Sequence, residues 1–241
     1  MTAAELMREL EADPDFRARS AQQERERAER EAEFRRAADP VLRDLEAAGI
    51  ETSDFGRFVN RPFPGVLEPS TFDEVAALPI LTRWLPRIAD TRVKETIVRH
   101  IKRKEAGPQA ASLLLREFAV TQDEGLGWVI GDAIATVADR SHFDEILALA
   151  ADKRHGHARS PLVGMLWRFK SDAADQVLTS SVANRDTAFD AMSAARRRFG
   201  NSAARELIAP LIDADDHRVR EAAREQLKRI DRYLGRQAGS S

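Results

Sequence analysis

The stretch GLGWVIGDAIATVADRSHFDEILALA, residues 125–150, predicts two amphipathic helices joined by a polar turn. Leu126, Ile130 and Ile134 follow one another at helical spacing, and a second apolar run begins at Phe143, after Asp-Arg-Ser-His. One pair of short helices cannot bury its own apolar faces, so further copies elsewhere in the chain would have to cover them.

The same apolar pattern recurs along the chain at a nearly fixed period. It opens at Val93, Leu126, Ala158, Ala188 and Val219, which are separated by 33, 32, 30 and 31 residues. Another helix is predicted before each of them, at residues 78–88, 110–119, 143–151, 174–182 and 204–212. Pro86 and Pro210 lie within two of these helices and should bend them. Because stacked helical hairpins bury a continuous core, the sequence predicts an all-α fold.

Several segments resemble HEAT-type repeats: ADTRVKETIVRHI (89–101), DEGLGWVIGDAIATVAD (123–139), DKRHGHARSPLVGMLWRF (152–169) and DADDHRVREAAREQLKRI (213–230). The shared features are an Asp-containing turn between two helices, a basic residue soon after it, and a first helix interrupted by Pro. The resemblance covers roughly two-thirds of the chain. It implies an α-solenoid of about five HEAT-like hairpins whose second helices line a concave face. Such proteins are usually scaffolds or adapters that bind proteins; a few bind nucleic acid or act as enzymes.

The composition changes outside the repeats, which are expected to occupy residues 71–234. Residues 1–49 predict a charged N-terminal helical extension, supported by i,i+4 ion pairs such as Glu26 with Arg30. Its C-terminal part could dock on the repeats, or the extension could be a partner-binding or coiled-coil arm. Residues 50–70 predict a Pro- and Phe-rich capping loop, which covers the end of the following core with Phe55, Phe58 and Phe63. Residues 235–241 are expected to be a disordered tail.

The bulk composition argues against several classes of protein. The chain contains no cysteine, which excludes disulfides and thiolate metal sites and suits a reducing compartment. No apolar segment approaches the roughly 20 residues that span a bilayer, and the acidic N-terminus is not a signal peptide. We therefore expect a cytoplasmic protein with no membrane partner. The net charge of −2 provides no general attraction to a polyanion.

The outward positions of the second helices form rows across the repeats. One row carries Arg at four of its five places: Arg103, Thr136, Arg168, Arg198 and Arg229. Arg near a helix C-terminus can simply stabilise the last carbonyl groups. The functional alternative is a basic stripe, densest at residues 196–198, that faces an acidic row and suits a partner of mixed charge. Arg favours such a role because its planar fork binds carboxylates or phosphates through two hydrogen bonds.

Trp128 and Asp132 are four residues apart and therefore share a helix face. Trp is enriched where partners bind most strongly, so the pair could be a recognition point. Alternatively, Trp128 fills a groove between repeats and Asp132 is merely solvated. Gly127 and Gly131 each cost about 1 kcal/mol in a helix interior, which indicates that they permit close packing by an adjacent helix.

The repeat family also includes DNA glycosylases that remove alkylated bases, using an acid with nearby Trp and Arg. Trp128, Asp132, Trp167 and Arg168 could take those parts, with Asp132 stabilising positive charge on the sugar as the base leaves. The spacing is weakly specific, and the net charge does not suit a protein that must neutralise several phosphates. His155 and His157 lie in a turn with no evident further ligand, which disfavours a metal site.

The sequence thus favours a non-catalytic protein-binding scaffold or adapter that needs no cofactor and no metal. Nucleic-acid binding is the alternative, and self-association through the N-terminal helix is a further possibility. The expected partner-binding residues are Arg99, Trp128, Asp132, Arg168, Arg197, Arg198 and Arg229.

Overall fold

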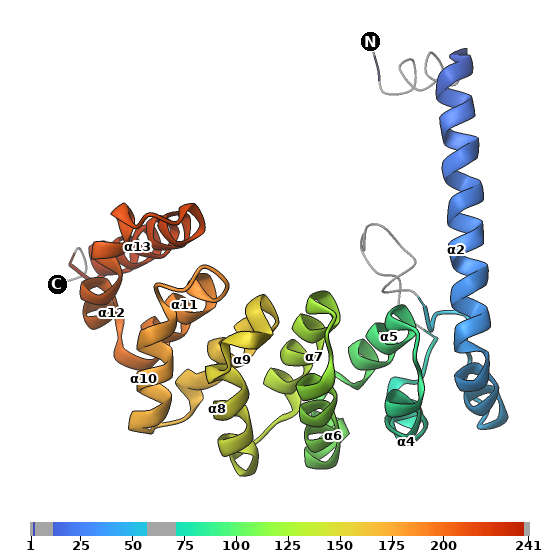
Figure 1. The fold of residues 1–241 in the computed structure, drawn as a ribbon, viewed down its shortest axis with the longest axis horizontal. Coiled ribbons are helices and arrows are strands. Elements are labelled where there is room, and N and C mark those ends of the chain that lie inside the picture. The colour runs from blue at the N-terminus through green and yellow to red at the C-terminus, as the bar shows by residue number, and fades with distance from the viewer. Residues whose placement is uncertain (1, 3–11, 57–70, 239–241) are drawn as a thin grey trace. The chain divides into compact units, whose positions relative to one another are not determined.

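The computed structural model describes residues 2, 12–56 and 71–238, and within them the regular secondary structure is entirely helical (Figure 1). The all-α class expected from the sequence is therefore confirmed for this part of the chain. The chain divides into two compact units, Met1–Asp73 with Ile88–Thr96, and Glu74–Arg87 with Ile97–Ser241. We call them the first and second units.

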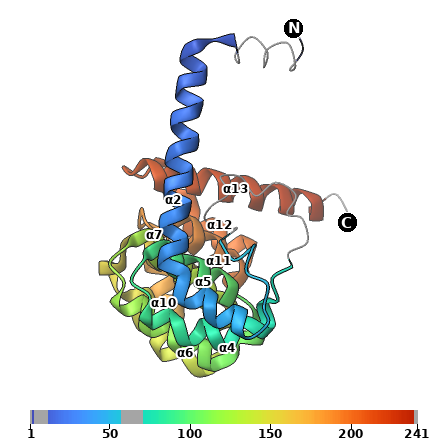
Figure 2. The same cartoon turned by 90° about the vertical axis from the view of Figure 1, so that its right-hand side faces the viewer.

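The first unit is built around α2 (Pro14–Ala47), the charged helix expected near the N-terminus. Asp13 caps it by accepting a hydrogen bond from the backbone N–H of Asp15. Its buried residues are confined to the C-terminal part: Phe34, Ala38, Val41 and Leu45. Pro40 lies inside the helix, and Figure 2 shows that the axis of α2 bends in its C-terminal part, as expected where a ladder hydrogen bond is missing.

The loop after α2 folds back onto the same unit. Gly49 has a φ of 76°, which lets the N–H groups of Gly49 and Ile50 bond to Glu46 and Leu45 and close the helix. Phe55 is buried, and its ring packs between those of Phe34 and Phe72, with centroid distances of 6.3 and 5.9 Å. Phe55 is thus covered within the first unit, and the expected cap over the core of the repeats stays a prediction. Phe58 and Phe63 lie outside the described residues.

The remaining helices alternate with short connections. In chain order they are α4 (Glu74–Trp84), η1 (Leu85–Arg87), α5 (Thr91–Ile101), η2 (Lys104–Ala106), α6 (Gly107–Val120), α7 (Glu124–Val137), η3 (Arg140–His142), α8 (Phe143–Ala151), η4 (Lys153–Arg159), α9 (Ser160–Met165), η5 (Leu166–Arg168), α10 (Asp172–Ser181), α11 (Ala188–Phe199), α12 (Asn201–Ile208), η6 (Ala209–Asp213) and α13 (His217–Ala238). Every helix expected from the periodicity is present.

The ends of some helices differ from the expected ones because Pro or Gly residues change the backbone there. Pro86 and Pro210 lie in the 3₁₀ segments η1 and η6, each of which continues an α-helix. Ala158, expected to open a second helix, lies in η4, because Gly156 is non-helical (φ 50°, ψ −131°) and α9 begins only at Ser160. The expected disordered tail is wrong for residues 235–238, which continue α13. A hydrogen bond from Gln237 to the Tyr233 hydroxyl supports this last turn.

Packing in the second unit connects alternate helices. α7 packs against α6 and α9, α9 against α11, and α11 against α13. The preceding helices form a similar set, since α8 packs against both α6 and α10. Figure 1 shows α6 to α13 following one another in chain order. The helices α6 to α11, and α13, therefore each pack on a counterpart from a neighbouring pair as well as on a chain neighbour.

Two glycines in α7 allow a close approach of the next segment, as expected. A Cβ atom on Gly127 would lie 2.8 Å from the Cβ of Ala158, closer than two such atoms can approach. A Cβ atom on Gly131 would lie 3.1 Å from the carbonyl oxygen of Ala158. Both glycines thus make room for η4 against α7.

Besides polar contacts between residues 29 or 33 apart, five polar links in the second unit join residues that are 30 apart. These links are Lys102 to Asp132, Ser112 to His142, Arg168 to the carbonyl oxygen of Ala138, Ser160 to Asp190, and Arg196 to Gln226. This separation equals the shortest of the gaps in the apolar pattern, which run from 30 to 33 residues.

Candidate functional site

A hollow of about 320 Å³ opens on one face of the second unit, over α7, α9, η5 and α11. We call it the tryptophan hollow. Its lining side chains combine two indoles, two carboxylates and two guanidinium groups: Trp128, Trp167, Asp132, Asp190, Arg168 and Arg197. Four of the seven expected partner-binding residues therefore lie together, on helices that are distant in sequence.

The two carboxylates of the tryptophan hollow are held by neighbours one repeat away. Asp132 accepts a hydrogen bond from the ammonium group of Lys102, just after α5. Asp190 accepts a hydrogen bond of 2.6 Å from the hydroxyl of Ser160, at the start of α9. Both carboxylates are thus oriented before any partner arrives, which lowers the entropic cost of binding.

The aromatic part of the hollow is partly covered by a cation. The guanidinium carbon of Arg197 lies 5.4 Å from the ring centre of Trp167, a cation–π arrangement. Arg197 is exposed, and both indoles are half-buried. A side chain of a partner that binds in the tryptophan hollow would contact the two indoles, the guanidinium group of Arg197 and the two carboxylates.

Three expected partner-binding residues, Arg99, Arg198 and Arg229, do not line this hollow. Arg99 is half-buried near the end of α5. Arg198 binds the carboxylate of Asp175 in α10. Arg229 pairs with Glu225 of its own helix and lies over the ring of Phe189 at 5.6 Å. The structure thus separates these three side chains from the tryptophan hollow.

The arginines of the row chosen from the sequence are all engaged by other parts of the protein. Arg103 pairs with Glu74 and donates to the carbonyl oxygen of His100. Arg168 donates to the carbonyl oxygens of Ala135 and Ala138, at 2.8 and 3.1 Å, and so caps the end of α7. Both arginines therefore stabilise the last carbonyl groups of a helix, which is the structural interpretation of the row. Arg168 does so for α7 rather than for its own helix.

The sequence did not indicate a Ser–His–Asp cluster that is present in the structure. The hydroxyl of Ser112 lies 3.1 Å from Nε2 of His142, and Nδ1 of His142 lies 3.0 Å from the carboxylate of Asp139. Hydrogen bonds from Ser141 are the main reason why the pKa of Asp139 is lowered. No local pattern indicates this cluster, because its Ser and His come from different helix pairs.

The geometry of this cluster suits a structural link. Nε2 of His142 also lies 3.2 Å from the carbonyl oxygen of Pro108, which calls for a proton on that nitrogen and leaves no lone pair to accept one from Ser112. Ser112 lies within α6, where helical hydrogen bonds occupy the N–H groups that could form an oxyanion hole. The cluster therefore anchors η3 to α6.

His155, in the turn 155–157, has a carboxylate neighbour, since Oδ2 of Asp152 lies 3.8 Å from its Nε2. The ring of His155 packs on Phe118 with a centroid distance of 4.8 Å, and Nδ1 of His157 lies 2.8 Å from the carbonyl oxygen of Asp186. Across the described residues, no group of three or more His, Cys, Asp or Glu side chains is placed to hold a metal ion.

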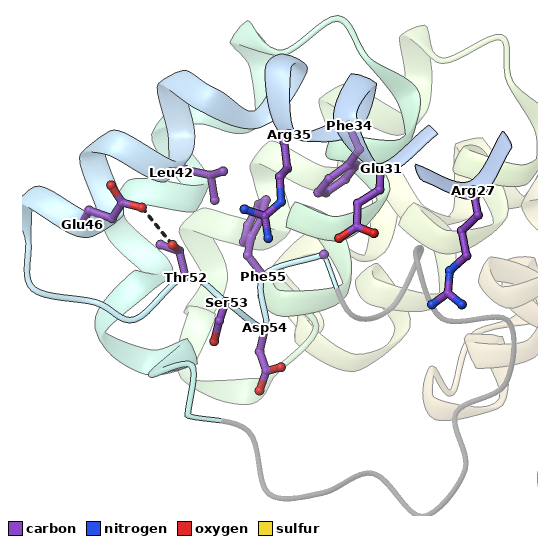
Figure 3. Close-up of a pocket in the computed structure, with 11 residues that line it drawn as sticks. Arg27, Glu31, Phe34, Arg35, Leu42, Glu46, Thr52, Ser53, Asp54 and Phe55 are labelled. Atoms are coloured by element: carbon purple, nitrogen blue, oxygen red, sulfur yellow. Dashed lines mark hydrogen bonds between the residues drawn. The ribbon is translucent and has the colours of Figure 1, made fainter. Parts of the chain in front are cut away.

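A separate hollow of about 300 Å³ lies in the first unit, beside α2 (Figure 3). Arg27, Glu31 and Arg35 line it from α2, and in the loop on its other side Thr52 donates a hydrogen bond of 3.0 Å to Glu46. Its charges are of both signs. Gly56 also lines it and is the last described residue before the gap at 57–70. We therefore assign no function to this hollow.

Within residues 2, 12–56 and 71–238, no helix has the length and apolar character needed to cross a membrane. Comparison of the chain with models of protein families, with curated proteins and with solved structures finds no match.

Proposed function

We propose that this chain is a non-catalytic adapter that binds another protein through the tryptophan hollow, on the second-helix face of a HEAT-like α-solenoid. The observation that carries the proposal is the gathering of Trp128, Asp132, Arg168 and Arg197 in one hollow. Trp and Arg are the side chains that most often dominate binding energy at protein interfaces.

The solenoid architecture is part of this proposal. The 30-residue separation of the polar links and the packing of alternate helices support it. Repeats that contact mainly their neighbours create an extended surface on which several helices contribute to one site. The tryptophan hollow is such a site, because residues of α7, α9 and α11 all line it.

The charges of the hollow favour a partner of mixed charge. Asp132 and Asp190 offer acceptors for a Lys or Arg side chain, and Arg197 offers a donor for a carboxylate. Charge complementarity of this kind sets orientation and rejects wrong partners more than it raises affinity. The aromatic surface of Trp128 and Trp167 would supply the apolar contact.

The test is capture of partners from a lysate of the native host, with and without nuclease. Trp128→Ala with Arg197→Glu removes aromatic surface and reverses an exposed charge without breaking a hydrogen bond within the described residues. We expect a protein captured by the wild type to be lost in this variant. Arg116→Glu on α6, an exposed residue outside the tryptophan hollow, is the matched control and should retain it. Identical proteins captured by all three would contradict the proposal.

Base release from alkylated DNA is the second candidate function. The observation in its favour is that Trp128, Asp132, Trp167 and Arg168 all line the tryptophan hollow. Against it, Asp132 is already paired with Lys102, and the net charge of −2 opposes duplex binding. Release of a methylated base by the wild type, lost in Asp132→Asn, would support this candidate. If neither protein releases the base, this second candidate is wrong and the adapter function remains the proposal.

A further inference from the structure

A second hollow lies beside the tryptophan hollow and shares Arg168 with it. It has a volume of about 340 Å³ and is formed by the segments around η3 and η5: Arg140, Phe143, Arg168, Phe169, Lys170 and Ser171. We call it the phenylalanine hollow. Its volume lies at the lower end of the range of about 300–1,000 Å³ for ligand sites. That volume suits one or two side chains of a peptide.

Two aromatic rings form the apolar part of this hollow. Phe143 and Phe169 pack with a centroid distance of 4.9 Å and an interplanar angle of 39°. Phe169 is 7% exposed, whereas Phe143 is half-buried and leaves part of its ring open to the hollow. A large apolar side chain could complete this pair, since aromatic rings favour tilted contacts at such distances.

The charged side chains that line the hollow are all basic, and Ser171 is its neutral polar residue. Arg140 and Lys170 are exposed and make no side-chain hydrogen bond or ion pair within the described residues, and no carboxylate lines the hollow. Arg168 donates to two backbone carbonyl groups at the end of α7, and no carboxylate pairs with it within the described residues. Asp139, next to Arg140, is occupied by Ser141 and His142. Three cations around an apolar floor are complementary to an acidic group attached to an apolar one.

We propose that the phenylalanine hollow binds an acidic peptide segment that carries one large apolar side chain. The apolar side chain would lie on Phe143, and flanking carboxylates would accept hydrogen bonds from Arg140 and Lys170. This inference rests on the proposed function, because the shared Arg168 makes the two hollows adjacent parts of one protein-binding surface.

The surrounding charges favour a peptide over nucleic acid. The first turn of α8 carries Asp144 and Glu145, and that of α10 carries Asp172. These carboxylates would repel a phosphate backbone running on from the hollow, whereas a short acidic cluster in a peptide need not pass them. The basic surface is therefore local, which agrees with the net charge of −2.

The test uses a fluorescein-labelled peptide, Ser-Gly-Glu-Glu-Phe-Glu-Glu-Gly-Ser, and its fluorescence anisotropy with the full chain. Matched peptides carry Gln for Glu or Ala for Phe. We expect saturable binding of the first peptide, at least about tenfold weaker binding of both matched peptides, and affinity that falls as salt is added.

Arg140→Glu with Lys170→Glu locates the site without touching the carbonyl contacts of Arg168. We expect this variant to bind the peptide at least about tenfold more weakly, and Arg116→Glu to bind like the wild type. Undiminished binding by the double variant, or equal binding of the Gln peptide, would overturn the proposal. So would tighter binding of a single-stranded oligonucleotide that is lost in the same variant, which would make nucleic acid the occupant.

The two sets of variants distinguish failure of this inference from failure of the proposed function, because they change different hollows. Arg140 and Lys170 do not line the tryptophan hollow, and Trp128 and Arg197 do not line the phenylalanine hollow. If the peptide fails to bind while a host protein still depends on Trp128 and Arg197, only the further inference is wrong.

Discussion

The guanidinium group of Arg198 binds the carboxylate of Asp175 through two hydrogen bonds, Nε to Oδ1 at 2.6 Å and Nη2 to Oδ2 at 2.7 Å. The pair connects the last turn of α11 to the first turn of α10. Their side chains are 19% and 27% exposed, so solvent weakens the pair only partly. An arginine that looks available for a partner in the sequence thus already has one inside the fold.

We expect Arg198→Glu to destabilise the protein, because it places two carboxylates together and removes two charge-assisted hydrogen bonds. The free energy of unfolding should fall by about 1–3 kcal/mol. Urea denaturation followed by circular dichroism measures the change. Arg197→Glu, one residue earlier and exposed, is the matched control and should leave the denaturation midpoint nearly unchanged. Equal stability of both variants would show that the Asp175 pair contributes nothing.

Glycine-to-alanine substitutions should have opposite effects at two helical positions. Alanine at Gly127 would bring its Cβ to 2.8 Å from that of Ala158, so η4 must move and we expect a loss of about 1–2 kcal/mol. Alanine at Gly235 in α13 meets nothing within 4 Å and should stabilise the helix by about 0.5–1 kcal/mol. Thermal denaturation of both variants tests this. A stabilising Gly127→Ala would mean that α7 and η4 are not tightly packed.

Asp152 should make stability depend on pH in acid. Hydrogen bonds from the side chain and the backbone N–H of Arg154 lower the pKa of Asp152 to about 2. A carboxylate whose pKa is lower in the folded state stabilises the fold above its unfolded-state pKa of about 3.8, and this contribution disappears as pH falls toward 2. We expect wild type to be more stable than Asp152→Asn at pH 5, with the difference shrinking by pH 3. Asp213→Asn is the control, because Asp213 is exposed and its side chain makes no hydrogen bond or ion pair within the described residues. A difference that stays constant between pH 5 and 3 would contradict this assignment.

The N-terminal part of α2 is the segment that we expect to self-associate. Residues 12–33 are exposed except for the half-buried Phe16 and Ser20. A helix that is polar all round requires either a partner or its own i,i+4 pairs, of which Glu26 with Arg30 is one at 3.8 Å. Light scattering should give a dimer for the full chain and a monomer for a chain that begins at Glu29 and keeps the buried Phe34. The same monomeric mass for both would exclude a dimer formed by α2.

The fold was predictable where one physical signal repeats. Val93 and Val219 are 1% exposed or less and lie on α5 and α13, so their helical spacing predicted burial correctly. Ala158 is also buried, but on a 3₁₀ segment, because the apolar period does not report the left-handed backbone of Gly156. Periodicity therefore located the buried faces more accurately than the type of helix.

The candidate site was predictable only in part. Trp128 and Asp132 share a helix face, so their proximity follows from sequence alone. Lys102 and Ser160 hold the carboxylates of Asp132 and Asp190 from the adjacent repeat, and such contacts depend on how neighbouring helices are offset. The carbonyl partners of Arg168 were unpredictable for the same reason, since any nearby helix end can accept its hydrogen bonds.

The separation of 30 residues that five of the polar links share has a consequence for how this chain could have changed in length. Each link joins a residue to its counterpart one hairpin later, so insertion of a single residue would shift every link that spans it by one position. Duplication or loss of a complete 30-residue hairpin would keep donors opposite acceptors. A change in length by whole pairs of helices would thus preserve these links, whereas a change by a single residue would not.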